Sequence, residues 1–355
     1  MPQDTGVGAR MAAEIAEQPQ VLARLLDSAG EIEDVARQIQ HARPRFVLIA
    51  ARGTSDHAAL YAKYLTEIRL GLPAGLASPS TLTVYGSRPD LTDVLFVAVS
   101  QSGGSPDLVD STAVARELGA LTVAVTNATD SPLAAAAQLH VNVRAGAELA
   151  VAATKTYTAE LLALYLLLSG AGSAAQAAGL PEAAARTLAL NAAEGAGRAA
   201  EAAAALRSVS RLVVTARGYS YPTAREAALK LMETSYLSAQ AFSGADLLHG
   251  PLAMIDAAVP VIAITSPGRG GQAMVPVMER LRSVDARVVP VADEGGLTGR
   301  TAPGAGLATA ADGVAEELMP LLEILPLQQL AWHLAVDRGE DPDRPRGLSK
   351  VTRTW

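Results

Sequence analysis

An apolar segment that ends in Arg-Gly and a polar helix start occurs twice in this chain. The first copy is Arg45-Phe-Val-Leu-Ile-Ala-Ala-Arg-Gly-Thr-Ser55, and the second is Arg211-Leu-Val-Val-Thr-Ala-Arg-Gly-Tyr-Ser220. An amphipathic helix is expected after each copy, near 56–70 and near 222–234, and further strands and helices alternate beyond it. Continuous apolar strands separated by helices are typical of parallel sheets that are covered on both faces. The sequence therefore predicts an α/β protein built from two similar halves.

The rest of the pattern divides the 355 residues into consecutive parts. Further strands are expected near 73–78, 94–99, 121–125, 260–264 and 287–291. Helices are expected near 9–28, 30–41 and 181–206, and Ser169–Ala174 has the composition of a linker. In the last segment, 341–355, two prolines and a glycine prevent regular structure, so we expect an irregular tail there. The sequence predicts a first domain at 45–172, to which N-terminal helices at 1–44 also belong, and a second domain at 173–340.

Composition narrows the classes of function. Half of the residues are apolar but only 4% are aromatic, which favours aliphatic cores. The net charge of −7 and the lack of any long basic run argue against a nucleic-acid partner. The chain has no cysteine, which excludes disulfides and thiolate catalysis. No apolar run has membrane-spanning length, and the start Met1-Pro-Gln-Asp-Thr5 is unlike a secretory leader, so we expect a cytoplasmic protein with no membrane partner.

The segment Val97-Ala-Val-Ser-Gln-Ser-Gly-Gly-Ser-Pro-Asp107 is the most informative for function. An apolar strand runs into serines and glycines, and Pro106 opens a helix. The first N–H groups of a helix have no intrahelical partner and carry partial positive charge, so this turn can receive an anion. It has neither the Gly-Lys-Ser/Thr of a Walker loop nor the Gly-x-Gly-x-x-Gly of a dinucleotide fold. A small phosphorylated metabolite is the ligand it favours, and a plain helix cap is the alternative.

Glu226, Lys230 and Glu233 stand at i, i+4 and i+7 and so share one stripe of a helix. A solvated, salt-bridged face is the ordinary interpretation of this spacing. Two observations favour a site instead. The residues between the three are almost all apolar, and the helix begins at the end of a repeated strand, where open α/β sheets place their ligands.

Among the histidines, His249 is the best placed for chemistry, because the Gly-Pro that follows it fixes a turn and presents the imidazole from the backbone. His57 comes next, and surface or packing positions are expected for the others, His41, His140 and His333. No pair of histidines has the spacing of metal ligands, so no metal site is predicted.

Two more turns could add donors to the same site. Arg52-Gly-Thr-Ser-Asp56 places hydroxyls at a helix start, beside the turn that begins at Ser100. Gly146-Ala-Glu-Leu-Ala-Val-Ala-Ala-Thr-Lys155 is a third loop that leads into a helix. In that loop Glu148 could reach a sugar hydroxyl or an amine, or it could cap the helix.

Together these motifs resemble the sugar isomerase (SIS) superfamily, with two SIS domains in tandem. The resemblance covers nearly the whole chain from Glu14-Ile-Ala-Glu-Gln-Pro19 onward. The motifs that carry it are Ser100-Gln-Ser-Gly103, Val151-Ala-Ala-Thr-Lys155, Glu226-Ala-Ala-Leu-Lys230, Glu233, His249-Gly-Pro251 and Pro345-Arg-Gly-Leu-Ser-Lys350. The chain resembles the isomerase half of glutamine–fructose-6-phosphate aminotransferases. Through Ala51-Arg-Gly-Thr-Ser-Asp-His57 and Ser105-Pro-Asp107 it resembles the type II glucosamine-6-phosphate deaminases more closely.

The resemblance implies two flavodoxin-like parallel sheets flanked by helices, a homodimer and no cofactor. It implies a phosphate site at Ser100, Gln101, Ser102 and Ser105. The residues near the sugar would be Gly53, Thr54, Ser55, Glu148, Val151, Glu226 and Lys230. Glu233 matches the carboxylate that moves a proton between C1 and C2, and His249 matches the imidazole that opens the ring from the neighbouring subunit. Lys350 matches the lysine of a tail that closes over the open-chain sugar.

Departures from the aminotransferase pattern bear on hydroxyl selectivity. Five positions differ from that pattern. The aminotransferases have an acidic residue where this chain has Gly104, a serine where it has Ala153, a lysine where it has Met232, a glutamate where it has Gln240 and an alanine where it has Ser349. The sequence also has no glutaminase domain and no cysteine nucleophile, so we expect no release of ammonia from glutamine by this chain.

The leading hypothesis is a deaminase that converts glucosamine 6-phosphate to fructose 6-phosphate and ammonia. Two other enzymes would suit the same scaffold, a fructosamine-6-phosphate deglycase and an isomerase of another aminosugar phosphate. A sugar-phosphate-binding sensor without catalysis is the alternative from a different class. Against the sensor stand the joint presence of Glu233, His249 and Lys350 and the lack of a helix-turn-helix segment at the N-terminus.

Overall fold

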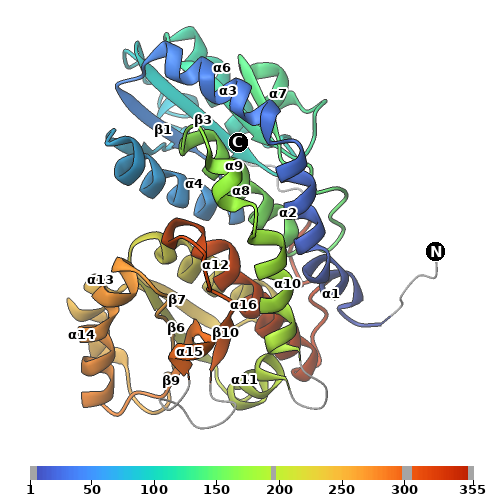
Figure 1. The fold of residues 1–355 in the computed structure, drawn as a ribbon, viewed down its shortest axis with the longest axis vertical. Helices are drawn as coiled ribbons and strands as arrows, with labels where there is room; N and C mark the ends of the chain where they lie inside the picture. The colour runs from blue at the N-terminus through green and yellow to red at the C-terminus, as the bar shows by residue number, and fades with distance from the viewer. Residues whose placement is uncertain (1–5, 193–196, 298–305, 351–355) are drawn as a thin grey trace. The chain divides into compact units, whose positions relative to one another are not determined.

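Two five-stranded parallel sheets form the framework of the protein. The computed structural model describes residues 6–192, 197–297 and 306–350 (Figure 1). The first sheet has the order β2-β1-β3-β4-β5. Its strands are β1 (Phe46–Ala50), β2 (Ala74–Leu76), β3 (Val94–Ser100), β4 (Leu121–Thr126) and β5 (Leu139–Asn142).

The second sheet repeats this topology with the order β10-β9-β8-β6-β7. Its strands are β6 (Arg211–Ala216), β7 (Ser238–Ser243), β8 (Val261–Ile264), β9 (Val288–Asp293) and β10 (Leu307–Thr309). Because the orders correspond strand by strand, β6 is the counterpart of β1 and β8 the counterpart of β3. In such a doubly wound sheet the ligand crevice lies outside the carboxyl ends of these two strands, where the direction of winding reverses.

Two groups of helices accompany the first sheet. One group packs together and consists of α3 (Ala29–Ala42), α4 (Thr54–Leu65) and α8 (Lys155–Leu168). The other consists of α5 (Pro79–Thr83), α6 (Pro106–Glu117) and α7 (Pro132–Ala136). A core of aliphatic side chains and Phe96 lies between α6, α7 and the strands. The first turns of α4 and α6 follow the carboxyl ends of β1 and β3, which brings both turns to the crevice position.

The second sheet is accompanied in the same way. One group contains α10 (Leu180–Asn191), α11 (Arg198–Leu206), α12 (Tyr221–Ser235) and α16 (Met319–Asp337). The other contains α13 (Gly244–Leu248), α14 (Arg269–Ser283) and the single turn α15 (Glu294–Leu297). The central helix α16 is apolar, with most of its residues buried.

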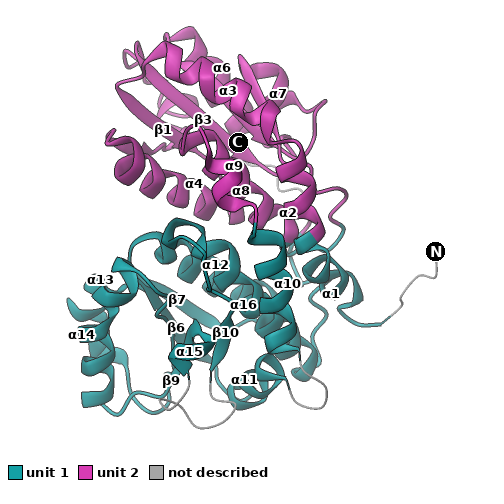
Figure 2. Cartoon of the chain, in the orientation of Figure 1, with its two compact units in different colours: residues 1–19, 149–154, 179–348 teal, residues 20–148, 155–178, 349–355 magenta. Residues whose placement is uncertain are grey.

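Residues cluster into two compact units that are discontinuous in sequence (Figure 2). Unit 1 holds the second sheet and consists of 1–19, 149–154 and 179–348. Unit 2 holds the first sheet and consists of 20–148, 155–178 and 349–355. Helix α1 (Ala9–Ala16) belongs to unit 1, whereas α2 (Gln18–Asp27) begins at the change from one unit to the other.

Several predicted elements differ from those observed. The helix expected near 9–28 is two helices, α1 and α2, and that expected near 181–206 is α10 and α11. A short helix, α9 (Ser173–Ala177), begins inside the expected linker. The strands β5, β7 and β10 were not predicted. All three lie at sheet edges and are short or alternately polar, so they lack the continuous apolar run that marks a central strand.

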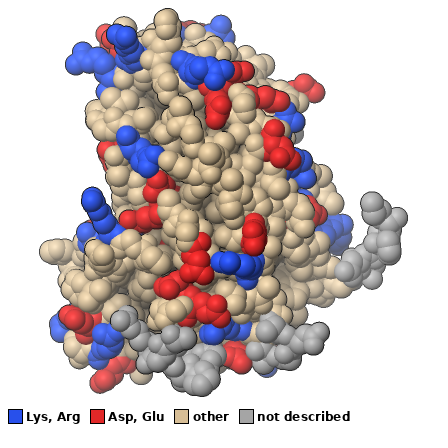
Figure 3. Space-filling model, viewed as in Figure 1, with Lys and Arg blue, Asp and Glu red and all other residues tan. Residues whose placement is uncertain are grey.

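None of the described helices is both long and apolar enough to cross a bilayer. On the face shown in Figure 3, basic and acidic side chains are interspersed. This distribution agrees with the absence of a basic run in the sequence.

Candidate active site

The turns after β1 and β3 meet at the crevice position of the first sheet. Arg52 follows β1, and its Nε and Nη2 lie 2.8 and 2.7 Å from Oδ2 of Asp107, in the first turn of α6. Asp107 is buried and Arg52 is about half exposed. This ion pair joins the two turns and leaves part of a guanidinium at their edge. Neither residue was among the predicted site residues, because nothing in the sequence pairs positions so far apart.

The turn Ser100–Ser105 has the geometry of an anion receptor. Ser100 Oγ accepts a hydrogen bond from Gly103 N (3.2 Å), and Ser102 Oγ accepts one from Gly104 N (3.3 Å). A hydroxyl that accepts still has its own proton to donate. Gly103 has a φ of 61°, and a Cβ there would lie 2.3 Å from Ser131 Oγ, so only glycine fits. Ser105 occupies the N-cap of α6 without making a side-chain cap bond, unlike the helix-cap alternative.

At the turn after β1, Gly53 is the N-cap of α4 with a φ of 58° and Thr54 is the first helical residue. The hydroxyl of Ser55 donates to Oε1 of Glu160 on α8 at 2.8 Å, and both side chains are buried. In this structure the Ser55 proton therefore has an internal partner. A contact of Ser55 or Thr54 with a sugar stays a prediction.

Glu148 and Lys350 form an ion pair within unit 2. Lys350 Nζ lies 2.7 Å from Glu148 Oε2, and the Glu148 side chain is fully buried. The same carboxylate accepts from Thr156 N at 3.1 Å and from Thr156 Oγ1 at 2.7 Å, in the first turn of α8. Glu148 thus caps α8, as the sequence alternative has it, and also fixes the ammonium of Lys350.

In unit 1 the predicted stripe Glu226–Lys230–Glu233 forms along α12. Lys230 is 1% exposed, and its Nζ lies 3.4 Å from Glu226 Oε1 and makes a hydrogen bond and ion pair with Glu233 Oε2. Glu226 is fully buried, whereas the side chain of Glu233 is 22% exposed. The stripe therefore leads from a buried carboxylate through a buried ammonium to a carboxylate that reaches the surface.

The direction of α12 corrects one part of the sequence argument. The helix runs back between the end of β6 and the start of β7, so its last turn lies toward the edge where the strands begin. With 15 residues it is roughly 20 Å long. Glu233, in that last turn, is therefore far from the carboxyl edge of the second sheet, and the strand-end rule does not account for its position.

His249 is exposed at the C-terminal end of α13, and Gly250 after it has a φ of 144°. The other histidines differ in their surroundings. His57 is buried, and burial lowers the pKa of both His140 and His333. His140 Nε2 pairs with Thr126 Oγ1 at 2.8 Å, and His333 packs edge-on against Trp332. These contacts agree with the packing roles expected for His140 and His333.

The crevice position of the second sheet is filled by the chain's own carboxylates. Glu316 accepts from the backbone N–H of Arg269 (2.9 Å) and Gly270 (2.7 Å), in the first turn of α14. Close by on α16, Glu323 is fully buried and accepts from Ser220 Oγ at 2.7 Å. Burial raises the pKa of Glu323 to about 7, although the nearby hydroxyls of Ser266, Ser220 and Thr223 oppose the shift.

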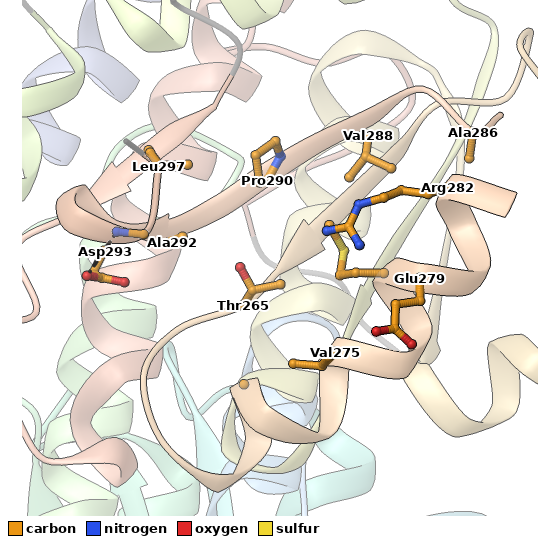
Figure 4. Close-up of a pocket in the computed structure, with 13 residues that line it drawn as sticks. Thr265, Val275, Glu279, Arg282, Ala286, Val288, Pro290, Ala292, Asp293 and Leu297 are labelled. Carbon is orange, nitrogen blue, oxygen red and sulfur yellow. Dashed lines mark hydrogen bonds between the residues drawn. The ribbon is translucent and has the colours of Figure 1, made fainter. Parts of the chain in front are cut away.

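A groove of about 860 Å³ in unit 1 contains none of the predicted site residues. It is bounded by α14, β9 and α15 and is partly apolar, through side chains such as Val275, Pro290 and Leu297 (Figure 4). Arg282 and Glu279 lie toward one end of it and Asp293 toward the other. Within the described ranges, no group of three or more histidine or acidic side chains could hold a metal ion.

The family model of the SIS domain matches residues 39–170 and 205–335, which span the two sheets. The chain belongs to the SIS family. Both the predicted resemblance and the predicted α/β fold with two parallel sheets are thereby confirmed. A curated relative, the isomerizing glutamine–fructose-6-phosphate aminotransferase of Methanothermobacter thermautotrophicus, is 35% identical over 99% of this chain. The chain spans 58% of the length of that relative.

Solved structures share the fold of this chain. A protein assigned as a phosphosugar isomerase from Silicibacter pomeroyi is 33% identical, with a TM-score of 0.81 over 94% of this chain and 99% of its own. Glucosamine-6-phosphate deaminase from Thermotoga maritima has a TM-score of 0.75 over 97% of this chain and 100% of its own, at 20% identity. The latter likeness is one of fold.

Proposed function

We propose that this SIS-family chain is a phosphosugar isomerase that acts on an aminosugar 6-phosphate, and that it converts glucosamine 6-phosphate and water to fructose 6-phosphate and ammonia. Its membership of the SIS family supports the reaction class, and its deaminase-like motifs favour the aminosugar. The observation that carries the proposal is the stripe on α12, in which buried Lys230 holds the partly exposed carboxylate of Glu233. Such a carboxylate can accept and return a proton next to a fixed positive charge.

The turn after β3 would bind the phosphate of the substrate. The hydroxyls of Ser100, Ser102 and Ser105 supply donors, and the partial positive charge at the start of α6 favours an anion. Gln101 and the half-exposed Arg52 flank them. A dianion suits this set of donors because its charge is balanced locally, in a chain whose net charge is −7.

The chemistry requires only proton transfers and one water molecule. His249 would move a proton between the ring oxygen and O1, which opens the sugar to its aldehyde. Glu233 would take the proton from C2 and return it to C1, while O1 gains a proton and the amine loses one, to give the C2 imine. Water adds at C2, and ammonia leaves as the ketone forms. Lys230 or Lys350 would stabilise the oxygen charge of the enolamine.

We further propose that two copies of the chain share the chemistry. His249 is exposed together with its neighbours Asp246, Leu248 and Gly250. An imidazole in this position can act in the site of a second copy. Lys350, held by Glu148, would cover the sugar from the tail.

Glu233→Gln should lower the rate of ammonium release from glucosamine 6-phosphate by about 100- to 10,000-fold, the usual contribution of a general base. Ammonium and fructose 6-phosphate would be measured with the purified protein. The matched control is Glu279→Gln, an exposed glutamate of unit 1, which should keep the wild-type rate. Thermal melting of both variants verifies that they are folded.

Other outcomes would identify the alternatives. Release of a free amino acid from a fructosamine 6-phosphate, with no ammonium from glucosamine 6-phosphate, would indicate the deglycase. Thermal stabilisation by sugar phosphates without turnover would indicate a binding protein. An unchanged rate in Glu233→Gln would contradict the role of this carboxylate.

A further inference from the structure

We propose that Glu14 on α1 is a positioning residue for the loop 149–154, which contains the predicted sugar-contacting residue Val151. The inference rests on the proposed function, because it takes that loop as part of the substrate site. Glu14 is separated from the loop by more than 130 residues in sequence, and both belong to unit 1.

The carboxylate of Glu14 is bound to the backbone of the loop. Glu14 is 4% exposed. It accepts a hydrogen bond from Leu149 N, and its Oε1 and Oε2 lie 3.4 and 3.3 Å from Ala150 N. A buried carboxylate is stable only if hydrogen bonds replace its water, so these N–H groups and the carboxylate fix one another.

Packing and a pair of amides hold the same loop at two further points. Met11 and Ile15 on α1 form a buried apolar cluster with Ala150 and Ala152. At the end of the loop, the side chain of Gln328 on α16 donates to Thr154 O at 3.3 Å. That amide in turn accepts from Gln18 Nε2 at 2.8 Å, and both glutamines are fully buried.

The tail is attached to the other end of α1. Asp343 accepts from Met11 N (2.8 Å) and Arg10 N (3.0 Å), so its carboxylate caps the helix. The carbonyl of Asp343 accepts from Val151 N at 3.4 Å. Helix α1 and Asp343 therefore both bind the loop 149–154. We call this group of α1, the loop and Asp343 the clasp. The tail that leads to Lys350 leaves from this clasp.

Within the clasp, Glu14 is the residue whose charged side chain binds the loop, so its replacement should move the loop. A glutamine has nearly the same shape but one acceptor oxygen, and its NH₂ group would face backbone donors. The loop should loosen while the packing of Met11 and Ile15 remains. The turn Ser100–Ser105 belongs to unit 2 and makes none of these contacts, so its affinity for phosphate should not change.

The test compares Glu14→Gln with Glu17→Gln, an exposed glutamate next to the same helix. Hydrogen–deuterium exchange would follow the peptide that contains Leu149–Val151. Inhibition constants would be measured for fructose 6-phosphate and for inorganic phosphate. Glu14→Gln should speed exchange in this peptide and weaken fructose 6-phosphate binding about 10-fold, with inorganic phosphate within about 2-fold of wild type. Glu17→Gln should match wild type in all three.

Two results would overturn the inference. One is unchanged exchange in Glu14→Gln, and the other is faster exchange with the sugar phosphate bound as in wild type. A general loss of folding would weaken both inhibitors together, which also counts against a positioning role. Failure of the proposed function would give a different result. The wild-type protein would then neither convert nor bind any sugar phosphate.

Discussion

Glu323 shows how strongly its surroundings can change a single carboxyl group. It lies fully buried on α16 with three hydroxyl groups near it and no cation among the groups that shift its pKa. Its pKa of about 7 lies above the value of 4.5 for a carboxyl in water. The folded chain therefore holds a proton here between these two pH values, and the unfolded chain does not. The stability gained in this way is complete below pH 4.5 and is lost as the pH rises through 7.

Glu323→Gln should remove this pH dependence. A difference of that size corresponds to about 3 kcal/mol in the free energy of unfolding. Raising the pH from 5 to 8 should therefore lower the stability of wild type, but not that of the variant, by about this amount. Denaturant unfolding at both pH values measures the difference, with Glu279→Gln as the control. Parallel curves for Glu323→Gln and wild type would contradict the assignment.

At this scale the sequence predicts contacts that are local and misses those that are not. The spacing of Glu226, Lys230 and Glu233 is enough to foresee their ion pairs, because helical geometry alone brings i, i+3 and i+4 together. The pair Arg52–Asp107 and the contact of Ser55 with Glu160 depend on the packing of separate elements. No periodicity in one sequence reports such contacts.

The corresponding turns of the two sheets show how one element has diverged. After β3, the turn presents serine hydroxyls at the N-terminus of α6, where the N-cap Ser105 makes no side-chain cap bond. After β8, the N-terminus of α14 is occupied by Glu316, whose carboxylate lies where an anion would bind. A Cβ at Gly268 would lie 2.4 Å from Glu316 Cδ, so the glycine is needed for this close approach. In the second turn, the N–H groups at the start of α14 thus donate to a carboxylate of the same chain.

Glu316→Ala should destabilise unit 1. It leaves the N–H groups of Arg269 and Gly270 without their carboxylate, which costs about 1–3 kcal/mol. Thermal or denaturant unfolding measures the loss, and Glu279→Ala, exposed on the same helix α14, is the control. Equal stability of the two variants would show that the carboxylate contributes nothing to this turn.

Whole elements were predicted well where burial is continuous. The central strands β1, β3, β4, β6, β8 and β9 are apolar runs and were foreseen, whereas the edge strands β5, β7 and β10 were not. The direction of α12 also had to come from the topology, since the chain must return to start β7 parallel to β6. This return places Glu233 at the edge opposite to the one that the sequence argument favoured.

Across the whole molecule, the compact units do not follow the chain in a linear way. Of the described residues, 6–19 and 149–154 cluster with the second sheet, and 349–350 with the first. The compact units thus join segments that are distant in sequence. The domain boundaries expected from the sequence, 1–44, 45–172, 173–340 and 341–355, stay a prediction.

The tail illustrates the same point. Its first part is held in unit 1, where Arg346 N donates to the hydroxyl of Tyr236 at 2.9 Å and the guanidinium lies 4.0 Å from the ring centre. Lys350 is held in unit 2 by Glu148. Val351 and Trp355, at the end of the tail, lie outside the described residues. Closure of the tail over a sugar stays a prediction.

Hydrogen exchange at C1 of fructose 6-phosphate in heavy water tests the role of Glu233 most directly. Ammonium is included, because in the proposed reaction Glu233 moves the proton on the C2 imine that ammonia forms with the ketone, and NMR follows the exchange. Wild-type protein should replace one of the two C1 hydrogens with deuterium, and Glu233→Gln should not. Exchange that is absent in wild type, or equally fast in Glu233→Gln, would contradict the assignment of this carboxylate as the base that moves the proton between C1 and C2.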